Sequence, residues 1–168
     1  TIVVGAAGND EITPDVGAAY VFVRSGTNWT QQAKLLANTS IEDDFLGMSA
    51  AISGDTALIG ADYGCCLPGL FNDTGAVFVF VRDGTSWTQQ AKLVADDADG
   101  GDRFGLSMAV SGNTALIASP QDRMSGQFSG SVYVFERSGT AWTQEDKLLP
   151  DANGHLFGVS LSMSGDLA

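Results

Sequence analysis

The residues of this chain that could most readily do chemistry are four aspartates in one short segment, Asp96-Asp-Ala-Asp-Gly-Gly-Asp102. Carboxylates are hard oxygen ligands of the kind that calcium prefers. Because a glycine pair lets the backbone turn sharply, Asp96, Asp97, Asp99 and Asp102 form a candidate calcium site, with calcium as the one cofactor that the sequence suggests. The spacing differs from that of a calcium-binding loop, so a solvated acidic turn is the alternative interpretation.

The sequence offers little for catalysis. His155 is the single histidine and lies in a Gly-Asn-rich connection, so a multi-histidine metal site is excluded. Gly105-Leu-Ser-Met-Ala109 partly matches the Gly-x-Ser-x-Gly nucleophile pattern, but Gly47-Met-Ser-Ala-Ala51 and Gly158-Val-Ser-Leu-Ser162 repeat it. A segment that returns three times indicates a repeated strand. We therefore assign no catalytic residue and expect the protein not to be an enzyme.

Two kinds of modification site are present. Asn28, Asn38 and Asn72 each begin an Asn-x-Ser/Thr acceptor pattern in an expected turn or loop, so they are candidate N-glycosylation sites. Cys65 and Cys66 are the only cysteines and are adjacent. They could form a vicinal disulfide, pair with another chain or stay free, and two cysteines do not define the redox compartment.

Composition limits the partners. Of the 168 residues, 44% are hydrophobic and 17% are charged, and the formal net charge is −12. This acidity opposes binding to nucleic acid and to anionic lipid. No apolar run approaches the roughly 20 residues that span a bilayer as a helix. We expect no nucleic-acid partner and no membrane insertion.

A repeat organises the whole chain. Two aromatic positions return in phase at Trp29, Trp87 and Trp142 and at Phe45, Phe104 and Phe157. The period is about 56 residues, which points to propeller blades or another β-repeat, since helical solenoids have shorter units. Each Trp also keeps a fixed phase with a following Leu, which favours packing between repeats over a sugar-stacking platform.

Each repeat contains four expected strands. In the second copy they are 45–53, 56–60, 75–82 and 86–94, and a Ser-Gly-Asp turn at Asp55 makes the first two a tight hairpin. The first two should lie deepest, while the fourth alternates apolar with polar residues, as a strand exposed on one side does. No segment holds a helical apolar period. The fold class is therefore all-β, with antiparallel four-stranded blades of the β-propeller type.

The repeats divide the chain, residues 1–168, into one array. Residues 1–44 are a first blade without its first strand, 45–103 a second blade and 104–156 a third. Residues 157–168 match the first strand of a further blade. Four-stranded units of this kind cannot bury their faces alone, so they must stack on one another, radially or linearly.

The repeated residues resemble the FG-GAP repeats found in the propeller heads of integrin alpha chains and in many bacterial surface proteins. The resemblance is carried by Phe104-Gly105, Phe157-Gly158, the variant Phe45-Leu-Gly47, Gly5-Ala6 and Gly60-Ala61. It implies a β-propeller fold and an extracellular or cell-surface location.

Two departures from the family pattern stand out. The proline that closes the family's Gly-Ala-Pro survives only at Pro120. The Asp-rich calcium loop of many family members is replaced by a short Ser-Gly-Asp or Ser-Gly-Asn turn, so its calcium ligands are not carried over onto Asp55, Asn113 or Asp166.

The two ends of the chain are halves of one element, since residues 1–6 match the second strand of the inner hairpin and 164–168 match its beginning. We therefore expect a non-enzymatic extracellular structural or adhesive repeat protein. It would form part of a larger propeller, or a head-to-tail fibre in which strands pair across the termini. Its partners would be copies of itself or adjacent repeats.

The long connections between strands carry most of the acidic residues and should share one face of the array. Because binding sites often lie on loops of a rigid scaffold, the alternative function is a ligand-binding propeller domain. That domain would use the acidic loop face for calcium or for a protein or glycan ligand.

Overall fold

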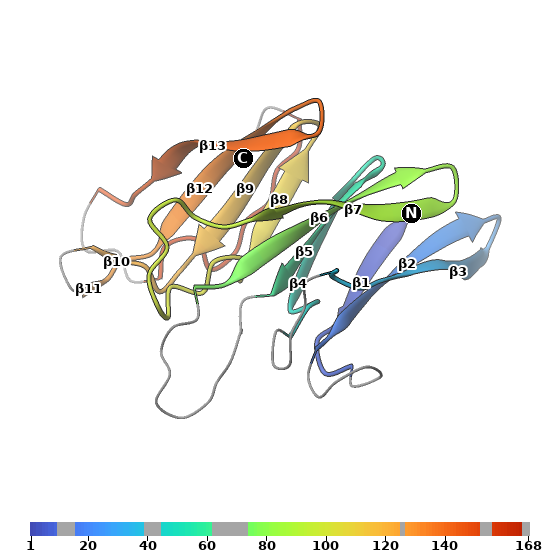
Figure 1. Ribbon diagram of the computed structural model, residues 1–168, viewed down its shortest axis with the longest axis horizontal. Coiled ribbons are helices and arrows are strands. Elements are labelled where there is room, and N and C mark those ends of the chain that lie inside the picture. The colour runs from blue at the N-terminus through green and yellow to red at the C-terminus, as the bar shows by residue number, and fades with distance from the viewer. Residues whose placement is uncertain (10–15, 39–44, 62–73, 125–126, 152–155, 166–168) are drawn as a thin grey trace.

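The computed structural model describes residues 1–9, 16–38, 45–61, 74–124, 127–151 and 156–165. Every regular element in this part of the chain is a β-strand, and the strands of each sheet pair antiparallel. The three larger sheets, of three or four strands each, lie side by side in chain order (Figure 1). The predicted all-β fold of antiparallel, propeller-type blades is confirmed, and we refer to the sheets as blades 1 to 3.

Blade 1 has three strands in the order β1-β2-β3: β1 (Ile2–Ala6), β2 (Ala18–Ser25) and β3 (Asn28–Leu35). They correspond to the second, third and fourth strands of the sequence repeat. The turn between β2 and β3 contains Gly26 at a φ of 62°, a left-handed conformation that glycine adopts without steric cost.

Blade 2 is a complete four-stranded unit in the order β4-β5-β6-β7. Its strands are β4 (Ser49–Ser53), β5 (Thr56–Ala61), β6 (Ala76–Asp83) and β7 (Ser86–Leu93). These agree with the strands expected from the repeat to within a few residues at each end. A tight turn with Gly54 at a φ of 57° joins β4 to β5, as the Ser-Gly-Asp signal predicts.

Blade 3 repeats this arrangement with β8 (Met108–Ser111), β9 (Thr114–Ser119), β12 (Ser131–Ser138) and β13 (Ala141–Leu148). The order is again sequential, β8-β9-β12-β13. β13 is the outermost strand of the blade.

The connection between β9 and β12 carries a small ribbon that the sequence did not predict. Its strands are β10 (Arg123–Met124) and β11 (Gln127–Phe128). The guanidinium carbon of Arg123 lies 4.6 Å from the centre of the Phe128 ring. A cation over an aromatic face is attractive, so this contact helps hold the ribbon together.

Burial is greatest in the two middle strands of blade 2. All of β5 and the first half of β6 are buried, whereas β4 is only half-buried. The expectation that the first two strands lie deepest is therefore right for β5, β8 and β9 and wrong for β4 and β1. Among the fourth strands, the first halves of β7 and β13 alternate in exposure as their polar residues indicate, whereas β3 is exposed throughout its first half.

Each fourth strand contains a β-bulge. The pairing of β2 with β3 passes from Gln31 to Ala33, so Gln32 has no opposite residue. Gln90 in β7 and Glu145 in β13 are left out of register in the same way. A bulge turns the extra residue out of the normal alternation of side chains, and these three side chains are thereby available to a neighbouring blade.

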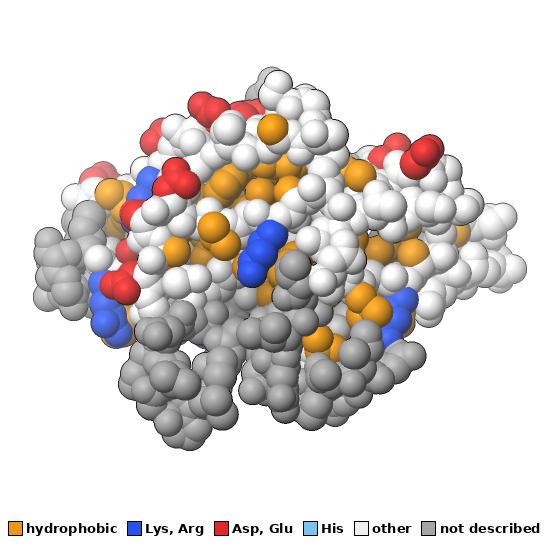
Figure 2. Space-filling model, viewed as in Figure 1, with side chains coloured by type: hydrophobic (Ala, Val, Ile, Leu, Met, Phe, Trp, Pro, Cys, Tyr) orange, Lys and Arg blue, Asp and Glu red, His pale blue; other side chains and the backbone are white. Residues whose placement is uncertain are grey.

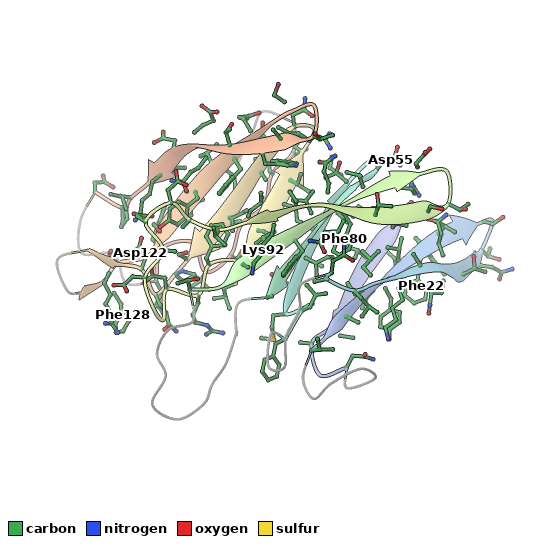
Figure 3. The ribbon with its side chains drawn as sticks, viewed as in Figure 1. Phe22, Asp55, Phe80, Lys92, Asp122 and Phe128 are labelled. Carbon is green, nitrogen blue, oxygen red and sulfur yellow. The ribbon has the colours of Figure 1, made fainter. Side chains whose placement is uncertain are left out.

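The core lies between the blades. One apolar cluster fills junction 1–2, the interface between blades 1 and 2, and includes Val21, Leu35, Ile59, Phe78 and Phe80. Figure 3 shows Phe80 between these blades and Phe22, its counterpart in blade 1, on the far side of blade 1. Because hydrophobic burial is the main favourable term in folding, packing between blades holds the array together.

Junction 2–3, the interface between blades 2 and 3, has its own cluster. Its aromatic centre is Phe104, which is fully buried and lies edge-on to Tyr133 and Phe135 at ring-centre distances of 5.5 and 6.0 Å. Leu58 and Ile117 complete the contact from β5 and β9. Edge-to-face ring pairs of this kind add to the energy of burial.

The anchor before blade 2 is displaced by one residue from the expected alignment. In blade 2 the residue that matches Phe104 is the fully buried Leu46, not Phe45. The backbone explains this register: Leu46 forms a parallel bridge with Gly17, as Phe104 does with Gly75. Phe45 precedes the anchor at a φ of 49° and is only half-buried.

Residues 156–165 follow blade 3 and form no strand in the described part of the chain. The N–H of Phe157 donates to the carbonyl of Ser129 at 3.0 Å, and that of Leu161 to Ser107 Oγ at 2.9 Å. The segment therefore lies along blade 3, and its assignment to a further blade stays a prediction, as does the division of the chain into blades by residue number. No helix among the described residues is long and apolar enough to cross a membrane.

Candidate functional site

Each junction contains a hydrogen bond between the tryptophan of one blade and the bulged glutamine of the preceding blade. Trp87 Nε1 donates to Gln32 Oε1 at 3.0 Å across junction 1–2, and Trp142 Nε1 donates to Gln90 Oε1 at 3.1 Å across junction 2–3. Each bulge is what turns its glutamine toward the next blade. The indoles therefore pack between blades, as their fixed spacing predicts.

An arginine at the end of each third strand also reaches the preceding blade. Arg82 Nη1 donates to Thr1 Oγ1 at 3.2 Å, and Arg137 Nη1 donates to Thr56 Oγ1 at 2.8 Å. The two threonines occupy equivalent positions at the start of β1 and β5. The junctions are thus related residue by residue.

The same arginines bind the turn of their own inner hairpin. Arg82 Nε donates to Asp55 Oδ1 at 2.7 Å, and Arg137 Nε donates to Asn113 Oδ1 at 3.1 Å. Asp55 and Asn113 occupy the place of the family's calcium loop, and here they are arginine acceptors.

Backbone contacts close the outer edge of each junction. The N–H of Asn38 donates to Gln89 Oε1 at 2.8 Å, and the N–H of Asp96 donates to Gln144 Oε1 at 3.1 Å. The segment that leaves one blade is thereby tied to the fourth strand of the next blade.

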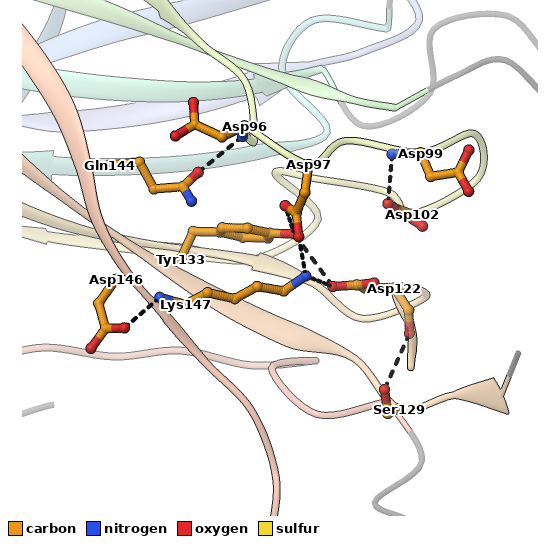
Figure 4. A network of polar contacts seen from close by, with 10 residues as sticks. All are labelled: Asp96, Asp97, Asp99, Asp102, Asp122, Ser129, Tyr133, Gln144, Asp146 and Lys147. Atoms are coloured by element: carbon orange, nitrogen blue, oxygen red, sulfur yellow. Dashed lines mark hydrogen bonds and ion pairs between the residues drawn. The ribbon is translucent and has the colours of Figure 1, made fainter. Parts of the chain in front are cut away.

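The predicted acidic segment lies against blade 3 and meets a lysine there (Figure 4). Lys147 Nζ lies 2.6 Å from Asp97 Oδ2 and 2.6 Å from Asp122 Oδ2. The hydroxyl of Tyr133 donates to Asp97 Oδ1 at 2.9 Å, and Lys147 Nζ lies 5.1 Å from the centre of the Tyr133 ring. We call these four residues the Lys147 cluster.

The electrostatics of the Lys147 cluster are those of a satisfied ion pair. Burial acts to raise the pKa of Asp97, but hydrogen bonds from Lys147 and Tyr133 outweigh it and hold that pKa below its ordinary value. Burial acts to lower the pKa of Lys147, and its contacts with Asp122 and Asp97 outweigh that effect and raise it. Burial raises the pKa of Tyr133 to about 12.

Asp102 lies apart from this ion pair and is only 4% exposed. Its Oδ2 accepts the N–H of Asp99 at 2.9 Å. Burial raises the pKa of Asp102; the Asp99 N–H opposes this rise, and the negative charges of Asp122 and Asp99 add to it. A buried carboxylate near other carboxylates is the arrangement in which a bound cation would be most favourable.

The four residues of the predicted calcium site are thus distributed over different contacts. Asp97 is paired with Lys147, while Asp99 and Asp102 bind each other through the backbone of Asp99. The backbone N–H of Asp96 donates to the side-chain oxygen of Gln144. Among the described residues no group of three or more His, Cys, Asp or Glu side chains is arranged to hold a metal ion. The calcium site stays a prediction, and Lys147 already supplies a positive charge to one of its four carboxylates, Asp97, as well as to Asp122.

Equivalent lysines in the other blades have different surroundings. Lys34 Nζ donates to Asn9 Oδ1 at 3.3 Å and lies 5.7 Å from the Tyr20 ring centre. Lys92 Nζ lies 5.4 Å from the ring centre of Phe78. Lys34, Lys92 and Lys147 each lie five residues after the Trp of their repeat. The carboxylates around Lys147 come from separate segments, which spacing in the sequence alone does not bring together.

Two of the three predicted glycosylation sites lie in the described part of the chain. Asn28 and Asn38 are exposed, so both are accessible, and their glycosylation stays a prediction. Asn72, Cys65, Cys66, His155 and Asp166 lie outside the described residues.

Large apolar side chains are exposed on the two outer faces of the array. Ile2, Val4 and Trp29 are 40%, 47% and 46% exposed on blade 1, and Leu148 and Phe157 are 39% and 38% exposed at blade 3. Figure 2 shows acidic side chains gathered over blade 3 on the visible face. These end faces carry residue types that are buried at the two junctions.

Fold and contacts together define a class: a propeller-type repeat array whose four-stranded blades pack through equivalent junctions. The family model described as FG-GAP repeat matches residues 29–80 and 87–135, which is more than half of the chain. The chain therefore belongs to the FG-GAP repeat family. Each match begins in the fourth strand of one blade and ends in the third strand of the next, so the family unit spans a junction. None of the curated proteins compared with the chain matches it.

Proposed function

We propose that this chain is a non-enzymatic structural or adhesive module of an extracellular or cell-surface protein, and that it works by joining its blades to further blades of the same kind. FG-GAP repeats typically occur in extracellular or surface proteins, and the family is generally non-enzymatic. The observation that carries the proposal is the exposure of junction residues on both end faces. Leu35 and Leu93 are 2% and 4% exposed at the junctions, whereas their counterpart Leu148 is 39% exposed.

The blade 1 face supports the same conclusion. Ala57 and Ile59 of β5 are fully buried against blade 1, while their counterparts Ile2 and Val4 in β1 are 40% and 47% exposed. Apolar surface gathered in this way usually marks an interaction site. A further blade on each end would bury it as the internal blades already do.

Sedimentation of the purified chain over a range of concentrations tests this proposal. We expect species heavier than the 17.4 kDa chain, visible by electron microscopy as closed rings or fibres. A stable 17.4 kDa monomer at every concentration would contradict blade joining by this chain.

Cation binding is a second candidate function, favoured by the burial of Asp102 beside Asp99 and Asp122. Calcium would relieve the repulsion among these carboxylates. Isothermal titration should then give heat that is lost in Asp102→Asn, while Asp83→Asn, an exposed change on blade 2, keeps it. Absence of heat and of a shift in melting temperature would rule out this function.

A further inference from the structure

We infer that the part of the outer face of blade 3 that Leu161 and Met163 leave uncovered is a docking surface for blade 1 of a second copy of this chain. Trp29 of the second copy would donate to Glu145, and its Arg24 would face Glu136. The inference rests on the proposed function and specifies its partner and contacts. It follows from placing blade 1 of the second copy against blade 3 in the same way that blade 2 packs against blade 1 and blade 3 against blade 2.

The Trp29 contact comes from the series of bulged residues. Gln32 accepts the indole N–H of Trp87, and Gln90 accepts that of Trp142. Glu145 is the bulged residue of blade 3 and is exposed. Trp29, the equivalent indole of blade 1, is 46% exposed. A carboxylate is a stronger acceptor than a neutral amide, so Glu145 is suited to bind it.

The Arg24 contact follows from the arginine series. Arg82 and Arg137 each reach the threonine that begins the second strand of the preceding blade. The matching threonine of blade 3 is Thr114, whose hydroxyl donates to Glu136 Oε1. Arg24 is exposed and its Nε donates only to the nearby carbonyl of Gly26 among the contacts described. An Arg24 placed as its counterparts are would meet the Glu136 carboxylate.

Charge distinguishes this surface from the internal junctions. Glu136, Glu145 and Asp146 occupy positions that are Val81, Gln90 and Ala91 in blade 2. The blade 1 face brings Arg24 and Lys34. Complementary charge favours one partner over others and speeds association, and a second copy supplies it together with the matching apolar residues.

Charge reversal with complementation tests the inference. Arg24→Glu alone and Glu136→Arg alone should each weaken self-association about tenfold or more, because each places like charges at every junction. An equimolar mixture should restore it, because in a ring or chain that alternates the two variants each junction pairs opposite charges. Asp83→Arg is the matched control, since it makes the same charge change at an exposed hairpin end of blade 2, and it should associate like the wild type.

The outcomes separate this inference from the proposed function. If the wild type does not associate, the proposed blade joining fails and the inference fails with it. If the wild type associates but the variants do so equally, or the mixture does not recover, this docking surface is wrong while the proposed function stands. Should Glu136→Arg fail to give the wild-type circular dichroism spectrum, Arg24→Glu alone carries the test, because Arg24 is exposed; unchanged self-association of Arg24→Glu would then show that this docking surface is wrong. Trp29→Phe should weaken association by about fivefold, the cost of one hydrogen bond.

Discussion

Junctions 1–2 and 2–3 are built on the same backbone and differ in their polar side chains. Both have an anchor residue bridged to a glycine, Leu46 with Gly17 and Phe104 with Gly75. In blade 3, however, Lys147 lies between two carboxylates, whereas Lys92 of blade 2 lies over the ring of Phe78. The two junctions thus have the same anchor–glycine bridge, which sets how closely the blades approach. They differ in the polar and charged side chains near that bridge.

The largest expected effect comes from the shared glycine bridge. Gly75 has a φ of 77°, and a Cβ added there would collide with the backbone oxygen of Phe104. Backbone cannot move aside as a side chain can, so Gly75→Ala should lower the free energy of unfolding by about 3 kcal/mol, strain and overpacking combined. Urea unfolding measures this change.

Substitutions at two other glycines separate the cost of backbone strain from the cost of the collision between blades. Gly84→Ala has the same kind of φ, 61°, but open space around the new Cβ, so it should cost only about 1 kcal/mol. Gly130→Ala would collide with Phe157, yet that segment is partly exposed and can move away, so its cost should fall between the two. Equal losses in all three variants would show that close approach of the blades is not what the bridge provides.

The second prediction addresses the lysines that differ. Lys147→Met leaves Asp97 and Asp122 without their counter-charge. Because the Asp122 side chain is only 13% exposed, the loss should be about 2 kcal/mol, reduced from the buried-pair value by the exposure of Asp97. Lys92→Met, the matched change in blade 2, removes a cation over a ring and should cost under about 1 kcal/mol.

The pH dependence of this difference has a definite sign. The pKa of Asp97 lies below its ordinary value of 3.8 in the folded chain, so the ion pair stabilises the fold above that pH. The stabilisation is lost as the pH falls through the lowered pKa. Thermal melts should therefore show a constant gap between wild type and Lys147→Met near neutral pH, closing only below pH 3.8. A gap that closes near pH 6 would contradict this origin.

The contrast between the junctions also shows what the sequence could predict. Trp29, Trp87 and Trp142 revealed the period, and from it followed the four strands and the stacking of blades. The bulges were not predictable, because Gln32 and Gln90 look like ordinary polar positions of an alternating strand. Their displacement depends on pairing with the third strand.

The anchor and the Lys147 cluster escaped prediction for related reasons. Aligning aromatic residues placed Phe45 with Phe104, whereas the parallel bridge to Gly17 selects Leu46. Asp97 was predicted as a metal ligand because its acidic neighbours are close in sequence. Its contact with Lys147 depends on a segment about 50 residues away and on the packing of blade 2 against blade 3.

The third prediction concerns the tryptophans. Trp142→Phe keeps most of the apolar volume but leaves Gln90 Oε1 without the indole N–H. A lost hydrogen bond at a half-buried site should cost about 1 kcal/mol in unfolding free energy, and Trp87→Phe should cost the same at junction 1–2. Trp29→Phe should have almost no effect on the stability of the isolated chain, since Trp29 is 46% exposed. A large loss from Trp29→Phe in dilute monomer would mean that this indole already has a structural role within blade 1.

The smallest expected effect distinguishes Asp102 from Asp97. Asp102→Asn retains an oxygen that can accept the Asp99 N–H but cannot ionise. Burial, opposed by that N–H and reinforced by the charges of Asp122 and Asp99, raises the pKa of Asp102, so the folded chain holds this proton more tightly than the unfolded chain. Above the raised pKa the ionised carboxylate therefore lowers stability, and the Asn variant should be more stable at pH 7, by under about 1 kcal/mol.

This gain should shrink as the pH falls through the raised pKa and should disappear below 3.8, where Asp102 is protonated in both states. Urea unfolding of wild type and Asp102→Asn at pH 7 and pH 3.5, without added metal, measures it. Repeating the pH 7 measurement with calcium separates two interpretations of the acidic segment. If a cation binds there, calcium stabilises only the wild type and reverses the sign of the difference; if the carboxylate is simply buried, calcium leaves the gain of the Asn variant unchanged.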